Sequence, residues 1–480
     1  MMSLSYTIEF FKKLAGFYVE PRIVGVPITA MKKHTYISWR SGSGKSELMK
    51  LLFYHLQQLS QKSSQYSLIL MDPHGDLTEE VLGFHLNNQS SKWQEYQRLL
   101  YFDLYGASGY TPIINPLELP KWIKTLEERE AMIDLLSQEL ARIFQEMIAS
   151  STLSLQMEAL LVPCIAVLLR KWNSSLSELQ RFMDDDLNDD LVALWQQSPH
   201  PGHQEFFKTA FKANSTYRLT KQSIYTKLQS LLNTQSFYHL TEGPSTIHLE
   251  EAINDGKVII LNLAQGKMGT EVSQLFGRLI IAMLQSIVLR RVYQPKTKRK
   301  STFLFIDECQ NYLSTTSIER MLAESRKYGL HLVLANQNLA QIESKKLKET
   351  LLSNTNVKFV GANSPTTLQK MSKEIGVKVK DFEGLPAYAF YLRIWQQAAR
   401  IFKPPNFLLR KKRKYYLKAT ERKALKKYLI YETGHYVPKK NPQELDELRQ
   451  ESTAPKPKYD LGTSQNTNTT SDIYPVSDHS

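Results

Sequence analysis

A glycine-rich loop between a short apolar segment and an amphipathic one constrains this chain more than any other feature. Residues 34–38 suit a buried strand, and leucines recur at helical spacing over residues 48–59. Such a strand–loop–helix unit directs backbone N–H groups and the positive end of the helix dipole toward one point, which suits the phosphates of a nucleotide. We therefore predict a P-loop formed by Ser41, Gly42, Ser43, Gly44, Lys45 and Ser46.

Two side chains of this loop have expected roles, and one position departs from the motif. Lys45 is placed to reach the β- and γ-phosphates of ATP, and the Ser46 hydroxyl to ligate Mg²⁺. The pattern G-x-x-x-x-G-K-[ST] wants glycine where this chain has Trp39. Glycine permits a sharp turn off the strand that a side chain restricts, and a bulky indole could also crowd the β-phosphate end of the loop. The alternative to a working site is therefore a loop that has lost nucleotide binding.

Two adjacent carboxylates end a second apolar run far along the chain. Residues 302–306 suit a strand buried on both faces of a parallel sheet, and Asp307 and Glu308 follow directly. Ligands of open α/β sheets bind at the carboxyl ends of the strands. We expect Asp307 to hold Mg²⁺ through water and Glu308 to polarise the attacking water as a general base.

Length, cysteine usage and hydropathy exclude several classes of protein. A chain of 480 residues is long enough for two or three domains. Cys164 and Cys309 lie in apolar stretches without metal-ligand spacing, so we expect buried thiols in a reducing cytosol and neither a disulfide framework nor a zinc site. The longest apolar runs, 159–169 and 279–289, are shorter than a membrane span and are expected to be core helices. We therefore expect no transmembrane segment.

The positive charge is concentrated near the C-terminus. Residues 400–440 hold fourteen Lys or Arg and two acids, and so supply +12 of the net charge of +14. Within them Arg410, Lys411, Lys412, Arg413 and Lys414 precede two aromatic residues, Tyr415 and Tyr416. Cations that contact phosphates beside aromatic rings that stack on bases are typical of nucleic-acid binding. An anionic membrane surface and a solvated basic helix face are the alternatives.

Alternating strand and helix patterns predict the domain organisation. Strands are expected at 67–71, 99–104, 257–263, 302–306, 331–335, 357–360 and 388–394, which implies a mostly parallel sheet covered by helices. Helical spacing without β-branched alternation predicts an all-helical insertion at 122–240. We expect a lead-in at 1–33, two parts of one P-loop domain at 34–121 and 241–400, a basic C-terminal arm at 401–451 and a disordered tail at 452–480.

An ordered set of motifs over about residues 34–400 resembles the motor ATPases of the HerA/FtsK group, most closely the TraG/TraD-type coupling proteins of conjugation and type IV secretion. Besides the P-loop and the two acids, the set comprises Asp72-Pro73-His74-Gly75-Asp76, Asn115-Pro116-Leu117, Arg326-Lys327-Tyr328-Gly329 and Ala335-Asn336-Gln337. The resemblance implies an α/β, RecA-like P-loop NTPase fold with an inserted all-α domain. Members usually begin with membrane-spanning helices, which we do not expect here.

The resemblance also implies roles and partners. Gln337 would sense the γ-phosphate, and Arg326 would reach the nucleotide of a neighbouring subunit, where arginine's planar fork neutralises charge on a transferring phosphoryl group. The alternatives are a cation at a helix C-terminus for Arg326 and turn residues for Asp72 and His74. The expected protein is a cytoplasmic, hexameric DNA translocase that uses ATP and Mg²⁺ and meets the inner face of the membrane through a secretion partner. A HerA-like motor with a nuclease partner and a nucleotide-insensitive DNA-binding scaffold are the competing functions.

Overall fold

The computed structural model describes residues 25–40, 44–63, 66–85, 96–103, 109–148, 154–171, 173–212, 215–313, 316–386, 388–405, 407–408, 411 and 414–439. The chain forms two compact units, Met1–Pro438 and Lys439–Ser480, and the fold described below is that of the first. Some of the predicted features fall outside the described residues. They concern Ser41, Gly42 and Ser43 of the loop, the cations Arg410, Lys412 and Arg413, most of the lead-in and the tail.

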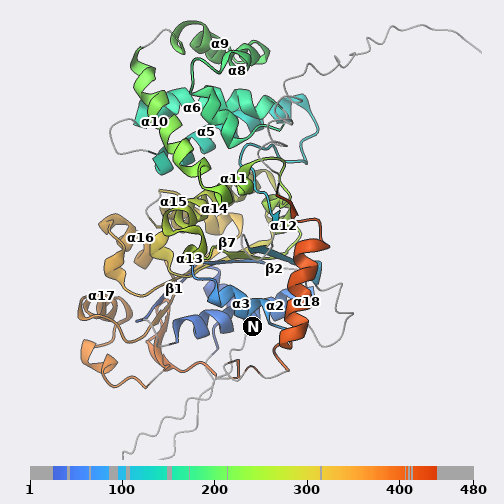
Figure 1. The fold of residues 1–480 in the computed structure, drawn as a ribbon. Helices are drawn as coiled ribbons and strands as arrows, with labels where there is room; N and C mark the ends of the chain where they lie inside the picture. Colours follow the sequence, from blue (N-terminus) through green and yellow to red (C-terminus); the bar gives the residue numbers. More distant parts are fainter. Residues whose placement is uncertain are drawn as a thin grey trace, which may run out of the picture. The chain divides into compact units, whose positions relative to one another are not determined.

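A nine-stranded sheet forms the centre of the first unit, with the strand order β10-β9-β8-β1-β7-β6-β2-β5-β3 (Figure 1). Its strands are β1 (Thr35–Ser38), β2 (Tyr66–Asp72), β3 (Leu99–Asp103), β5 (Val258–Asn262), β6 (Ser301–Ile306), β7 (Leu330–Asn336), β8 (Val357–Val360), β9 (Phe390–Ile394) and β10 (Arg400–Phe402). The strands from β8 to β3 pair in parallel, and only β8–β9 and β9–β10 are antiparallel among the described pairs of this sheet. The predicted α/β fold with a mostly parallel sheet is confirmed.

Alternate residues of the central strands enter two hydrophobic cores, one on each face of the sheet. One face carries α2 (Lys45–Ser63), α3 (Asp76–Leu82) and α18 (Ala419–Tyr431). The other carries α12 (Leu249–Asn254), α14 (Thr270–Arg290), α15 (Thr316–Glu324), α16 (Lys345–Asn354) and α17 (Pro365–Ile375). Figure 1 shows α2 and α3 across the sheet from α14 and α15. This double cover explains why the strands read as continuous apolar runs rather than as alternating ones.

The predicted all-α insertion is present between β4 (Tyr110–Thr111) and α12. Its α-helices are α5 (Leu126–Ile148), α6 (Ser154–Arg170), α7 (Leu176–Phe182), α8 (Asp189–Ala193), α9 (Pro201–Glu205), α10 (Ser215–Leu232) and α11 (Gln235–Thr241), and the described residues among them hold no strand. Asn115 anchors the insertion at its base, because its side-chain Nδ2 donates to the carbonyl oxygens of Ser174 at 2.7 Å and Gly243 at 3.0 Å. The asparagine of the Asn-Pro-Leu motif thus joins the entry of the insertion to its exit.

One helical segment of the described residues, Thr270–Tyr293, is long and apolar enough to cross a membrane by length and composition. Its most apolar window is 72% buried inside the protein. The prediction that residues 279–289 form a core helix is confirmed, although the helix extends well before the apolar run. Cys164 and Cys309 are also fully buried, as expected, and burial raises the pKa of both thiols.

The basic segment near the C-terminus belongs to the first unit as far as Pro438, and its described residues pack there. Tyr416 is buried, and its ring meets Phe84 edge-on at 5.2 Å between centroids. Further on, α18 buries Leu425 and Leu429 in the core that it shares with α2 and α3, and β11 (Val437–Pro438) pairs with β4. The expectation that the Tyr416 ring is available to stack on a base is therefore wrong, because that ring is used for packing.

Candidate active site

Four of the predicted site residues meet at the carboxyl edge of the sheet. Lys45 begins α2, Asp307 and Glu308 follow β6, and Gln337 follows β7. Lys45 Nζ lies 2.8 Å from Asp307 Oδ1 and also contacts Glu308 Oε1. Gln337 Nε2 donates to Glu308 Oε1 at 2.8 Å. Because β7 lies between β1 and β6 in the sheet, these three strands bring together side chains that are far apart in the sequence.

Burial and mutual charge set the ionisation of this cluster. Lys45, Asp307 and Glu308 are each 4–6% exposed. Burial alone would lower the pKa of Lys45, but the two carboxylates outweigh it, and the pKa is raised. Burial alone would raise the pKa of Glu308, but Lys45 and two amide donors lower it below its ordinary value. Burial outweighs Lys45 at Asp307, whose pKa is raised. Glu308 is therefore held ionised at neutral pH.

The main chain at Glu308 adopts an uncommon conformation. Its φ is 44°, in the left-handed region that costs energy for residues with a β-carbon. The side chain is fixed at both oxygens, since Gln310 Nε2 donates to Oε2 at 2.8 Å while Lys45 and Gln337 bind Oε1. Backbone strain held in place by such contacts is concentrated at functional sites.

A cavity of about 400 Å³ opens beside the cluster. It is lined by Gly44, Lys45, Ser46, Glu47, Lys50, Asp72, His74, Asp76, Leu77, Glu80, Asp307, Glu308, Gln337 and Tyr388. Sequence reasoning missed Lys50, Glu80 and Tyr388, and no motif in the sequence marks them. The sequence pattern puts Tyr388 inside a strand, whereas β9 begins only at Phe390.

The Asp72-Pro73-His74-Gly75-Asp76 motif forms one wall of this cavity. The Asp72 carboxylate accepts hydrogen bonds from the backbone N–H groups of His74 at 2.9 Å and Thr78 at 3.0 Å. Both of its oxygens thus hold the turn into α3, which agrees with the turn role that the sequence allowed. His74 is exposed at the cavity wall, and its Nδ1 lies 3.3 Å from Gln265 Nε2.

Trp39 is buried in the core and approaches Gly44, the glycine before the P-loop lysine. The residue is 2% exposed and belongs to the core on the α2 face of the sheet. Its indole lies directly on Gly361, where a β-carbon would come within 2.5 Å of the ring, and meets Phe390 edge-on. Trp39 does not adopt a positive φ, so the chain leaves β1 without the turn that requires glycine. Trp39 is absent from the described lining of the cavity beside Lys45. The expected crowding of the phosphates stays a prediction, since residues 41–43 lie outside the described part of the chain.

Arg326 lies away from this cluster. It is exposed in the 3₁₀ turn Ser325–Tyr328, which precedes β7 and so stands at the amino edge of the sheet. Gly329 ends this turn with a φ of 83°, a left-handed conformation that glycine adopts readily. Nearby are His34 and His331, and burial lowers the pKa of each to about 3. The structure does not bring Arg326 to the nucleotide edge of its own chain.

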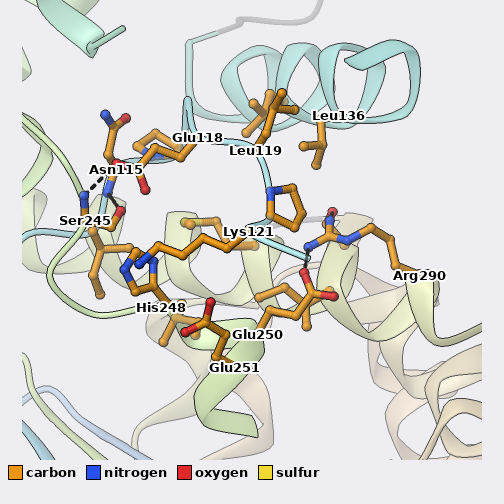
Figure 2. Close-up of a pocket in the computed structure, with 18 of the residues that line it drawn as sticks. Asn115, Glu118, Leu119, Lys121, Leu136, Ser245, His248, Glu250, Glu251 and Arg290 are labelled. Carbon is orange, nitrogen blue, oxygen red and sulfur yellow. Dashed lines mark hydrogen bonds and ion pairs between the residues drawn. The ribbon is translucent and has the colours of Figure 1, made fainter. Parts of the chain in front are cut away.

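A second cavity lies where the insertion meets the P-loop domain (Figure 2). Figure 2 shows Arg290 of α14 and Glu250 of α12 pointing toward one another, and the Nη2–Oε2 distance is 2.7 Å. Arg290 also donates to Ser286 Oγ at 2.5 Å, and Ser286 in turn donates to Glu139 of α5. This chain of polar contacts links the insertion to the helix that precedes β6.

Fold and site together define a P-loop NTPase with two carboxylates at the end of the β6 strand. Residues 21–381 match the family model of the type IV secretion-system coupling protein DNA-binding domain. Because this match spans most of the chain, the protein belongs to that family.

Solved structures agree on the fold. The unbound bacterial conjugative coupling protein TrwB, lacking its first 70 residues, matches with a TM-score of 0.57 at 16% identity over 80% of this chain and 86% of that one. The plasmid coupling protein TrwB with a non-hydrolysable GTP analogue gives 0.55 at 16% identity over 80% and 88%. Its complex with ADP and Mg²⁺ gives 0.53 at 16% identity over 80% and 87%. Among curated proteins, none matched this chain.

Proposed function

We propose that this protein is an ATP-hydrolysing motor that moves DNA in conjugative or type IV secretion-like transfer. The observation that carries the proposal is the contact of Lys45 with both Asp307 and Glu308 beside a cavity at the start of α2. A buried cation at a helix N-terminus suits phosphate, and the family membership supports DNA as the substrate.

The residues at this edge suit ATP and Mg²⁺. Lys45 would exchange its carboxylate partners for phosphate oxygens, while Ser46, at the start of α2, and the buried Asp307 would hold the metal. Mg²⁺ would neutralise charge on the phosphates. Glu308, ionised and fixed at both oxygens, accepts a proton from the attacking water, and Gln337 orients that carboxylate.

We further propose that the protein acts as a hexameric ring. Arg326 is exposed at the edge of the sheet opposite to Lys45, so it is available to a neighbouring subunit rather than to its own site. A guanidinium supplied across an interface would stabilise charge on the transferring phosphoryl group. In each subunit we propose that residues 34–121 and 241–400 form the motor domain around an insertion at 122–240. We propose residues 401–451 as a basic C-terminal arm and residues 452–480 as a tail.

We propose DNA as the polymer that this motor binds. The motor would act in the cytoplasm and dock on a membrane-bound secretion component. The five cations of Arg410 to Lys414 are the proposed phosphate contacts. Replacing them with neutral residues should lower the slope of log affinity against log salt by roughly 0.7–0.9 for each phosphate that is no longer neutralised. An unchanged slope would assign this run to a membrane, a protein or solvent.

DNA-stimulated ATP hydrolysis tests the motor directly. The purified chain should hydrolyse ATP faster with DNA present, and Lys45→Ala should abolish both rates. If the parent chain does not bind nucleotide, this result would instead favour the DNA-binding scaffold. Copurification of a nuclease would favour a HerA-like processing motor.

A further inference from the structure

An exposed tyrosine lies against the glycine that precedes the P-loop lysine. Tyr388 is 46% exposed and lines the cavity with Lys45 and Glu308. A β-carbon built on Gly44 would lie 2.7 Å from Tyr388 Cδ1, so the tyrosine ring packs on the main chain of Gly44. Tyr388 has a φ of 60°, an uncommon conformation for a residue with a β-carbon. Its ring is thus held at the loop while much of the side chain stays open to solvent.

The strand order places Tyr388 at the end of the site away from the acids. Across the carboxyl edge the strands run β6, β7, β1, β8 and β9. Glu308 follows β6 and Gln337 follows β7, so the γ-phosphate end lies on that side of β1. Val360 at the end of β8 pairs with Tyr391, so the start of β9 returns to the same edge. A triphosphate whose γ end faces Glu308 therefore directs its nucleoside toward β8 and β9.

Aromatic side chains pack tightly beside Gly44. Trp39 also approaches Gly44, with Cη2 3.4 Å from a β-carbon built there, and Phe390 packs edge-on against its indole. Gly361 lies under the same indole. The Trp39 ring thus fills the space beside Gly44, and Tyr388 is the tyrosine among the described residues of the cavity wall, with its side chain exposed.

We propose that Tyr388 stacks on the base of the bound nucleotide. The proposal rests on the function proposed above and adds the recognition of the nucleoside to that of the phosphates. Aromatic stacking offers a ring face rather than base-specific hydrogen bonds, so it holds a purine without selecting adenine over guanine.

Calorimetric titration of the full chain tests this assignment. The ligands are a non-hydrolysable ATP analogue and inorganic tripolyphosphate, each with Mg²⁺, and the variants are Tyr388→Ala and Tyr388→Phe. Tyr431→Ala serves as control, because Tyr431 is a similarly exposed tyrosine at 44%, whose ring meets Tyr110 instead. Tyr388→Ala should weaken binding of the ATP analogue roughly 5- to 150-fold, the range that corresponds to loss of one base–aromatic stack.

The titration with tripolyphosphate distinguishes base stacking by Tyr388 from a structural role of this side chain. Tyr388→Ala should leave tripolyphosphate affinity unchanged, and Tyr388→Phe and Tyr431→Ala should bind both ligands as the parent does. Equal losses for both ligands, or no loss for either, would overturn the stacking assignment while leaving the proposed ATPase intact. A parent chain that binds neither ligand would overturn the ATPase proposal and this inference with it.

Discussion

Replacing Trp39 with glycine restores the consensus of the loop but removes a buried indole from the core. An aromatic side chain buries about 150–250 Å², which at about 25 cal/mol per Å² corresponds to roughly 4–6 kcal/mol. Truncation of a buried Phe or Trp to alanine typically costs about 3–5 kcal/mol. Trp39 Nε1 has no hydrogen-bond partner within the described structure, so the loss is one of packing and apolar burial. We expect the free energy of unfolding to fall by about 3–5 kcal/mol.

The surroundings of the indole offer little to fill the space that its removal leaves. Gly361 contributes no side chain beneath the ring, and Phe390 packs against it at an interplanar angle of 78°. Against a total stability of ~5–15 kcal/mol, the expected loss is a large fraction. Since the indole belongs to the core and is not part of the described cavity lining, its removal should not raise the ATPase rate.

Urea denaturation and ATPase rate, measured on the same preparations, check this prediction. Trp122→Gly is the matched control, because Trp122 is 43% exposed and the same substitution there should cost far less. Unchanged stability with a faster ATPase would refute the packing argument and show that the indole hinders the nucleotide. A slower ATPase at unchanged stability would show that Trp39 itself handles the nucleotide.

Three further predictions concern charges at the two edges of the sheet. Glu308→Gln should retain ATP binding and nearly abolish turnover in a steady-state assay, because it removes the base and leaves the phosphate contacts; turnover at the parent rate would remove Glu308 from the mechanism. Arg326→Ala should stop hydrolysis at nearly parental ATP affinity, and rings mixed with Glu308→Gln subunits should regain part of the rate; assembled rings without recovery would assign Arg326 to a structural or cis role. Because burial lowers the pKa of His34 and His331 to about 3, the unfolded chain binds protons that the folded chain does not as pH falls below about 6.5. The free energy of unfolding, measured in urea, should therefore fall from pH 7 to pH 5 by about 2 kcal/mol for each histidine, and His331→Gln should remove about half of that pH dependence.

The sequence alone determined the elements and the chemistry of the two central motifs. Strand and helix positions follow from local apolar periodicity, and parallel strands that are buried on both faces leave an especially clear pattern. The P-loop lysine and the paired acids are also local signals, since each is defined by a few adjacent residues at the end of a strand. The ordered motifs were enough to identify the family. Strand ends were less well defined, as at Tyr388, because a backbone turn depends on what packs around it.

Only the tertiary structure decided how these parts meet. Lys45 contacts Glu308 across 263 residues of sequence because β7 inserts between β1 and β6, and strand order is not encoded locally. The place of Trp39 depends on Gly361 and Phe390, which belong to distant segments and leave room for an indole beside Gly44. Arg326 precedes β7 and Gln337 follows it. These two residues of the motif set therefore lie at opposite edges of the sheet. The packing around Trp39 and the contacts of Lys45 arise between remote segments, and for that reason no local pattern could supply them.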